Sequence, residues 1–326
     1  MKTFKRITAA MLAMFLLFGF AACGEKTEGE STDVLTELAS SYIRDVKTKI
    51  AALDGVNSIC ISKFSVDREY NYETTVYKTA DEIAGLLKNG GTDIAVVPVD
   101  FAAKLYGETN GAIQLLAVNS LGFYHVVENG DKIKSIADLK GKTVYAAYQG
   151  TGFEAVINHI FTQNGIDPEK DIDLQFKATD AEVAKLADGS TDVILILPEP
   201  YASKVIYNTE TYKKAVSINA EWDEISETPL AQSVIVARKE FVEANPDITE
   251  EFLGFEKISI NYLKTNVYGA PVFLNDNGFV ENAVLATDVI AGCNFSFLSR
   301  EEMKTAVSAV LAVYGITVDD AFYYGA

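Results

Sequence analysis

The 326-residue sequence contains only three cysteines, two histidines and one tryptophan. Cys23, Cys60 and Cys293 are far apart and form no CxxC pair, which excludes a disulfide-rich scaffold and a cysteine-based zinc site. The sequence also has no G-x-S-x-G motif beside its two histidines, His125 and His159, so a serine hydrolase is not indicated. We therefore expect neither a metal site nor a cofactor.

Basic residues are scarce as well. The chain has 28 lysines and arginines against 46 aspartates and glutamates, a formal net charge of −18. An acidic surface is repelled by phosphate backbones and by anionic lipid headgroups, which excludes nucleic acid as a partner and attachment to a membrane by charge. The 48 % apolar content is nevertheless sufficient to fill the cores of two domains.

Long apolar runs are limited to one, from Ile7 to Phe20, which follows three basic residues and is too short to be a stable membrane anchor. The run leads into the tetrapeptide FAAC, which resembles a bacterial lipobox. We interpret residues 1–22 as a lipoprotein signal peptide, Cys23 as the lipidated residue, and residues 23–45 as a polar tether with a short helix. A plain secretory signal with a chance cysteine is the alternative.

From residue 46 onward, short Val- and Ile-rich runs alternate with helical segments, which predicts an α/β fold with right-handed βαβ units on mostly parallel sheets. Four helix starts carry a capping box, at Thr79, Thr151, Thr179 and Ser299. Strands are expected within the ranges 48–53, 72–77, 92–99, 143–149, 171–177 and 193–197, and helices within 79–91 and 152–165 and from residues 100 and 179.

An internal repeat divides this alternation into two halves. Residues 77–106 match residues 176–206, and each copy contains a strand ending in proline, Pro98 in the first and Pro198 in the second, that leads directly into a helix. Two copies at this spacing predict two similar α/β lobes. Because ligands of open α/β sheets bind outside the carboxyl ends of the strands, we expect both proline turns to line one cleft.

The turns at the strand ends supply the candidate ligand-binding residues. None of these turns contains Lys or Arg, which an anionic solute usually requires, so we favour a neutral or cationic, nitrogenous heteroaromatic solute. A sulfonate or nitrate held by helix N-termini is the alternative. The candidates are Asp54, Asn57, Ser58, Pro98, Asp100, Tyr148, Gln149, Thr151, Gly152, Phe153, Glu199 and Tyr201, with Tyr124 at an expected hinge.

One motif offers a competing function. Gly150, Gly152 and Ala155 formally satisfy the G-x-G-x-x-A fingerprint of dinucleotide-binding proteins. Lys177 stands at the end of the next strand, where that fingerprint requires an acidic residue, so a Rossmann-type oxidoreductase is disfavoured. The glycines are better interpreted as a tight strand-to-helix turn whose free amides, at Gly152 and Phe153, face the cleft.

The order of these blocks resembles a known family. The lipobox, the segments TADEIAGLLKNGGTDIAVVPVDFAAKLY, LLAVNSLGFYHVVENG, SIADLKGKTVYAAYQGTGFEAVINHIFTQNGID and LPEPYASKV together resemble solute-binding proteins of ABC importers, in the branch of nitrate, sulfonate, taurine and thiamine-precursor binders. The resemblance covers nearly all of the chain after residue 23. It implies a type 2 periplasmic-binding-protein fold, in which two lobes close on a small solute by hinge bending.

The same resemblance implies an organisation and a set of partners. Residues 46–121 and 235–326 would form the first lobe and residues 122–234 the second, with Asn294 closing the cleft from the first lobe. The partners would be a small solute, an ABC permease with its ATPase, and the membrane through the lipid on Cys23. We expect a monomer without enzymatic activity on the outer face of a Gram-positive cell membrane; an enzyme of the same fold and a ligand sensor are the alternatives.

Overall fold

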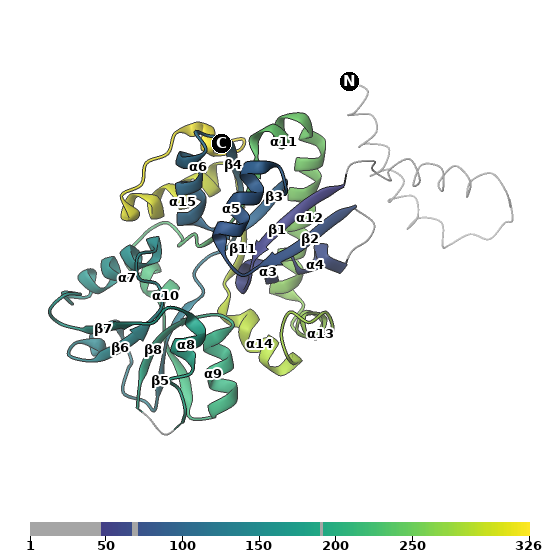
Figure 1. The fold of residues 1–326 in the computed structure, drawn as a ribbon. Helices are drawn as coiled ribbons and strands as arrows, with labels where there is room; N and C mark the ends of the chain where they lie inside the picture. The colour runs from purple at the N-terminus through teal and green to yellow at the C-terminus, as the bar shows by residue number, and fades with distance from the viewer. Residues whose placement is uncertain (1–46, 67–70, 190–191) are drawn as a thin grey trace, which may run out of the picture. The chain divides into compact units, whose positions relative to one another are not determined.

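The computed structural model describes residues 47–66, 71–189 and 192–326. The signal peptide, Cys23 and the short helix expected before residue 46 lie outside the described residues. Within the described residues, two mixed β-sheets are each flanked by helices, so the chain has the two-lobed α/β architecture (Figure 1). No helix in this part of the chain is both long and apolar enough to cross a bilayer.

The first sheet has six strands in the order β11-β4-β10-β3-β1-β2. Its strands β1 (Thr48–Leu53), β2 (Tyr72–Tyr77) and β3 (Ile94–Pro98) pair in parallel, whereas β4 (Ile113–Ser120), β10 (Ser233–Arg238) and β11 (Phe295–Ser299) pair antiparallel. The helices of this lobe are α3 (Val56–Cys60), α4 (Ser62–Val66), α5 (Ala80–Asn89), α6 (Val99–Glu108), α11 (Lys239–Ala244), α12 (Pro246–Thr265), α13 (Gly269–Asp276), α14 (Ala283–Gly292) and α15 (Arg300–Tyr314), with the 3-10 turn η2 (Asp320–Phe322).

The second sheet repeats the first with five strands in the order β7-β6-β8-β5-β9. Strands β6 (Thr143–Ala146), β7 (Asp173–Phe176) and β8 (Ile194–Pro198) pair in parallel, and β5 (Tyr124–Asn129) and β9 (Tyr212–Ser217) are antiparallel. Its helices are α7 (Gly152–Gln163), α8 (Asp180–Ala184), α9 (Tyr201–Thr209) and α10 (Ile218–Asp223), with the 3-10 turn η1 (Ile136–Leu139).

The two sheets share one topology. The unit β2-α5-β3-α6 in the first lobe corresponds to β7-α8-β8-α9 in the second, which confirms the repeat that the sequence predicted. Parallel pairing, however, is restricted to the three βαβ strands of each lobe. The sheets are mixed, because β10 and β5, the strands that enter each sheet after a crossover, run opposite to their neighbours.

Alternating strand residues explain why the strands of the first sheet are continuously apolar. Ala51 and Ala95 face one core, against α5, α6 and α15, whereas Ile50, Ile94 and Val96 face the other, against α4, α11 and α12. All five side chains are buried. Since both faces of the sheet are covered, the inner strands β1 and β3 bury apolar side chains on both sides, as the sequence pattern indicated.

The predicted capping boxes were only partly correct. The Thr79 and Glu82 side chains form the complete box at the start of α5, and the Thr179 hydroxyl accepts a bond from the Glu182 amide at the start of α8. The hydroxyls of Thr151 and Ser299 cap nothing. At Thr151 the reason is local, since its hydroxyl donates to the Tyr148 carbonyl instead, at 2.6 Å.

Candidate functional site

A cavity of about 450 Å³ lies where strands of both sheets end. Its wall in the first lobe comes from the turn after β1 and from the residue that follows β2, and its wall in the second lobe comes from the turns after β6, β7 and β8. Small-molecule sites commonly have volumes of this order. The lining residues are Leu53, Asp54, Gly55, Ser58, Ile59, Lys78, Ala147, Ala178, Thr179, Asp180, Pro200, Tyr201, Lys204 and Phe279.

Three of the residues proposed from the sequence line this cavity. Asp54 accepts a bond from the Gly55 amide at 3.0 Å, and Ser58 donates to the Gly55 carbonyl at 2.9 Å, so the turn after β1 is fixed by its own side chains. Tyr201 begins α9 directly after the proline turn of β8. The expectation that ligands bind at the carboxyl ends of the strands therefore identified part of the cavity wall in each lobe.

The residues that follow β2 and β7 also line the cavity, although the sequence did not predict them as part of the site. Lys78 follows β2, and Thr179 and Asp180 follow β7, in the repeated segments YKTAD and FKATD. In the sequence, these segments were interpreted only as helix caps. Their repetition at corresponding strand ends was the signal that could have placed them in the cleft.

Two lysines also enter the cavity wall, which corrects the premise that no cation lies there. Both are engaged by carboxylates: Lys78 forms an ion pair with Asp54, and the Lys204 ammonium lies 2.8 Å from Glu281. The hydrogen bond and charge of Asp54 raise the pKa of Lys78. The cavity wall therefore contains cations, but each has a carboxylate partner within the protein.

Asp100 connects the two lobes. Its carboxylate, in the first turn of α6, accepts a hydrogen bond from the Gly152 amide at the start of α7, at 2.8 Å. A side chain at position 152 would collide with Asp100, because an added Cβ would lie 2.5 Å from the Asp100 Cβ. The amide that the sequence analysis assigned to an oxyanion of the solute is thus occupied by a carboxylate of the protein.

Replacing Asp100 by alanine should accelerate hydrogen exchange of the Gly152 amide by about tenfold or more, because hydrogen bonds to charged groups contribute about 1.5–3 kcal/mol. Exchange measured by mass spectrometry on peptides covering residues 149–156 would report it. Asp100→Asn retains an acceptor and should have a smaller effect. Unchanged exchange in the alanine variant would mean that this bond does not hold the lobes in solution.

Three aromatic rings of the second lobe pack against one another outside the cavity wall. Tyr124 stacks on Phe153 with ring centroids 3.9 Å apart, and Tyr148 meets Phe153 edge-on at 5.4 Å. Burial raises the pKa of Tyr124, and the negative charges of Asp180 and Asp100 raise it further. The Tyr124 phenol therefore belongs to the same electrostatic environment as the cavity, although its ring does not line the cavity.

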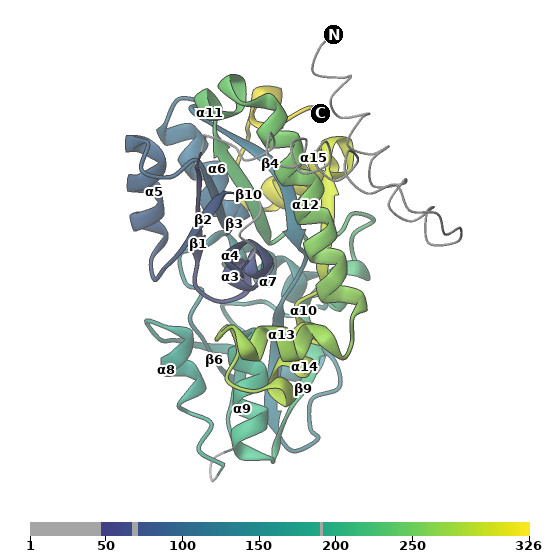
Figure 2. The ribbon, with the colours of Figure 1, turned by 90° about the vertical axis from the view of Figure 1, so that its right-hand side faces the viewer.

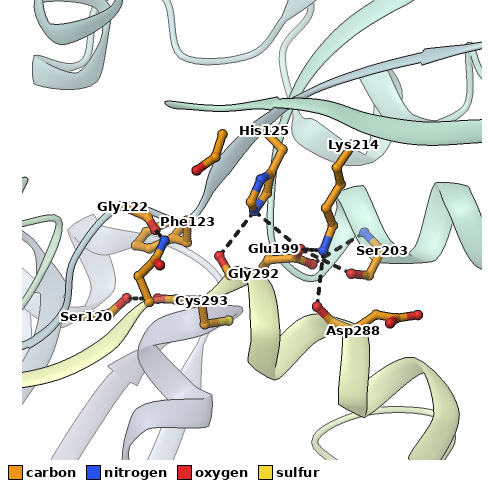
Figure 3. Close-up of polar contacts among 12 residues, drawn as sticks. Ser120, Gly122, Phe123, His125, Glu199, Ser203, Lys214, Asp288, Gly292 and Cys293 are labelled. Carbon is orange, nitrogen blue, oxygen red and sulfur yellow. Dashed lines mark hydrogen bonds and ion pairs between the residues drawn. The ribbon is translucent and has the colours of Figure 1, made fainter. Parts of the chain in front are cut away.

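Glu199 is placed differently from the expectation. It is buried, is absent from the cavity wall, and forms an ion pair with Lys214 of β9 and a hydrogen bond from the Ser203 hydroxyl at 3.1 Å (Figure 3). Desolvation raises its pKa, and Lys214 opposes that rise. The polar contacts around Glu199 connect the second lobe to α14 and lie away from the cavity wall.

The C-terminal end of α14 receives two side chains of the second lobe. His125 Nε2 lies 3.1 Å from the Gly292 carbonyl, and Lys214 donates to the Asp288 carbonyl at 3.1 Å (Figure 3). Figure 2 shows α14 beside α9, with α13 next to it. Burial and the Lys214 charge lower the pKa of His125 to about 4, so the imidazole is neutral near pH 7.

The remaining candidates serve local structure. Asn57 is buried and accepts a bond from the Ser233 hydroxyl at 2.8 Å, and Asn294, with a φ of 45°, donates to the Gly122 carbonyl and lines a different groove. Pro98 is the N-cap residue of α6, and Gln149 and Thr151 are exposed. The structure thus brings Asp54, Ser58 and Tyr201 together and leaves these five outside the cavity wall.

The chain belongs to the NMT1/THI5-like family, because residues 87–266, more than half of its length, match the model of that family. This agrees with the resemblance found in the sequence. No curated protein sequence matches the chain.

The fold is similar to those of solved ABC import proteins. An ABC transporter protein from Parabacteroides distasonis is 20 % identical with a TM-score of 0.73, over 86 % of this chain and 99 % of the other. The periplasmic aliphatic sulphonate binding protein SsuA from Escherichia coli is 14 % identical with a TM-score of 0.65, over 82 % and 86 %. A zinc-bound ligand-binding component of an ABC-type import system from Staphylococcus aureus is 13 % identical with a TM-score of 0.66, over 85 % and 95 %. These likenesses establish the periplasmic-binding-protein fold.

Proposed function

We propose that the protein is the extracytoplasmic solute-binding component of an ABC importer, which captures a small solute between its lobes and presents it to a permease. The observation that carries this proposal is the cavity lined by strand ends of both sheets, since closure of two lobes about such a cavity encloses a solute without any covalent step. Membership of the NMT1/THI5-like family and the names of the structural neighbours support it.

The lobes in this proposal are residues 46–121 with 235–326, and residues 122–234. The protein acts as a monomer on the outer face of a Gram-positive cell membrane, held there by lipid on Cys23 after removal of residues 1–22. Its partners are the permease and, through the permease, a cytoplasmic ATPase. Because the protein surface is acidic, the lipid supplies the attachment that charge cannot.

The solute in this proposal is neutral or cationic and nitrogenous, with a heteroaromatic body that packs on Tyr201 and Phe279. Asp54 and Ser58 are its proposed polar contacts in the first lobe. The alternative is a sulfonate or nitrate, which the name of the Escherichia coli neighbour suggests. An anion would have to displace Asp54 from Lys78 or Glu281 from Lys204 to gain a cation.

The test is a thermal-shift screen in which small neutral, cationic and anionic solutes are added one at a time to the purified protein. A ligand at a hundred times its dissociation constant stabilises the folded state by about 2.7 kcal/mol. We expect at least one small solute to raise the melting temperature and to be recovered chemically unaltered by mass spectrometry. Conversion of the solute during incubation would instead indicate an enzyme of the same fold.

A further inference from the structure

Asp180 is a carboxylate in the cavity wall without a partner among the residues that the structure describes. It begins α8, directly after the Thr179 cap and at the carboxyl end of β7. No residue within 47–66, 71–189 or 192–326 forms a hydrogen bond or an ion pair with its side chain. Desolvation therefore acts unopposed and raises the pKa of Asp180 to about 6.

The other charges of the cavity wall cancel in pairs. Lys78 is paired with Asp54, and Lys204 is paired with Glu281. The described wall therefore has one uncompensated charge, the negative charge of Asp180. A carboxylate partly removed from water gains most from a cation that replaces its lost hydration.

Aromatic side chains line the same cavity as this carboxylate. Tyr201 and Phe279 line the same cavity, and the Tyr124 phenol is near enough for the Asp180 charge to raise its pKa. The faces of aromatic rings attract cations, and they also pack against a flat or apolar body. One negative charge beside several rings is an environment suited to an organic cation and unfavourable to an anion.

We propose that Asp180 is the counter-ion for a singly charged organic cation, whose nitrogen lies at this carboxylate and whose body packs on Tyr201 and Phe279. The proposal rests on the solute-binding function above and adds to it the charge of the solute and the residue that selects it. Lys78 and Lys204 each have a carboxylate partner, so Asp180 is the charged group of the described wall that is left for the solute.

The first experiment compares melting temperatures of the mature protein with choline, 4-aminopyrimidine, ethanesulfonate and nitrate as probes. We expect a cationic or basic probe to raise the melting temperature and ethanesulfonate and nitrate to have no effect. Stabilisation by ethanesulfonate or nitrate alone would overturn the assignment to Asp180 and leave the solute-binding function intact. Absence of stabilisation by choline and 4-aminopyrimidine would overturn the assignment to Asp180, whereas the solute-binding function is tested by the wider screen above.

The second experiment measures the affinity of the stabilising probe by calorimetry in variants. Asp180→Asn should weaken binding about 30-fold or more, because it removes one partner of a desolvated charge pair. Asp180→Glu retains the charge and should bind more tightly than Asp180→Asn. The matched control is Asp81→Asn, which removes an exposed carboxylate from the first turn of α5, the corresponding helix of the first lobe, and should bind like the wild type. Equal affinities for Asp180→Asn and Asp81→Asn would overturn the proposal.

The pH dependence provides a readout that a structural role would not give. The wild-type affinity should fall as the pH decreases below about 6, because the solute competes with a proton for Asp180. The affinity of Asp180→Asn should not change over that interval. A wild-type affinity independent of pH between 5 and 8 would contradict the proposal. The other charged or titratable groups facing Asp180 are Asp54, Lys78, Tyr201 and Lys204 in the wall, Glu281 beside Lys204, and Asp100 and Tyr124 next to the cavity.

Discussion

Replacing Lys214 by methionine should lower the free energy of unfolding by about 3 kcal/mol, because removal of one partner of a buried ion pair leaves the other as an uncompensated charge. The Glu199 carboxylate that remains is fully buried. Lys214 is itself 23 % exposed, so water can reach part of the site, which places the expected value at the lower end of the range for such pairs. Urea unfolding at pH 7 would measure it.

Two comparisons make the Lys214 result specific. Lys134→Met removes a lysine that is itself mostly exposed and whose ion-pair partner Asp131 is also mostly exposed, and should cost less than about 1 kcal/mol. The double variant with Glu199→Leu removes both charges and should recover much of the stability. If Lys214→Met and Lys134→Met unfolded at the same urea concentration, the buried pair would contribute nothing to joining α14 to the second lobe.

Glu256→Gln should stabilise the protein at neutral pH by about 3 kcal/mol. Glu256 lies on α12 within the first lobe, is completely buried, and accepts one hydrogen bond, from the Asn119 amide at 3.1 Å. Burial raises the pKa of Glu256 to about 8, from an ordinary value of 4.5. A glutamine side chain can accept the same bond and has no proton to exchange with solvent.

The pH dependence of this effect follows from the direction of the shift. The folded protein keeps a proton on Glu256 up to about pH 8, whereas the unfolded chain releases it near pH 4.5. Raising the pH through that interval therefore favours unfolding, by about 1.4 kcal/mol per pH unit. Melting curves of wild type and Glu256→Gln should coincide near pH 4.5 and separate towards pH 8. The exposed control Glu243→Gln should follow the wild type, and a constant difference at every pH would contradict the assigned pKa.

Much of the fold could be predicted because its determinants are local and repeated. The alternation of apolar strands and helices predicted an α/β fold. The two repeated segments, each with a strand that ends in proline (Pro98 or Pro198), predicted two lobes. The directions of β5 and β10 could not be predicted, because strand polarity depends on how the chain crosses between sheets and not on strand composition. The prediction of mostly parallel sheets therefore did not include the reversed strand next to β3 and the one next to β8.

The cavity wall could be predicted only at residues that lie close to the end of a strand and also line the cavity. Asp54, Ser58 and Tyr201 follow from the expectation that ligands bind at the carboxyl ends of the strands. Glu199 follows from it equally well, yet its side chain turns away to Lys214, because a lysine from β9, far along the chain, lies beside it. The hydrogen bond between the Gly152 amide and the Asp100 carboxylate likewise joins the two lobes, and no feature of either local segment predicts it.

The central claim, that the cleft captures a small solute without changing it, is tested most directly by native mass spectrometry of the mature protein with the solute found by the thermal-shift screen. We predict one solute per chain, released with its mass unaltered, and loss of the complex in the Asp180→Asn variant but not in Asp81→Asn. A solute that is released with a changed mass, or that binds equally to both variants, would contradict the account.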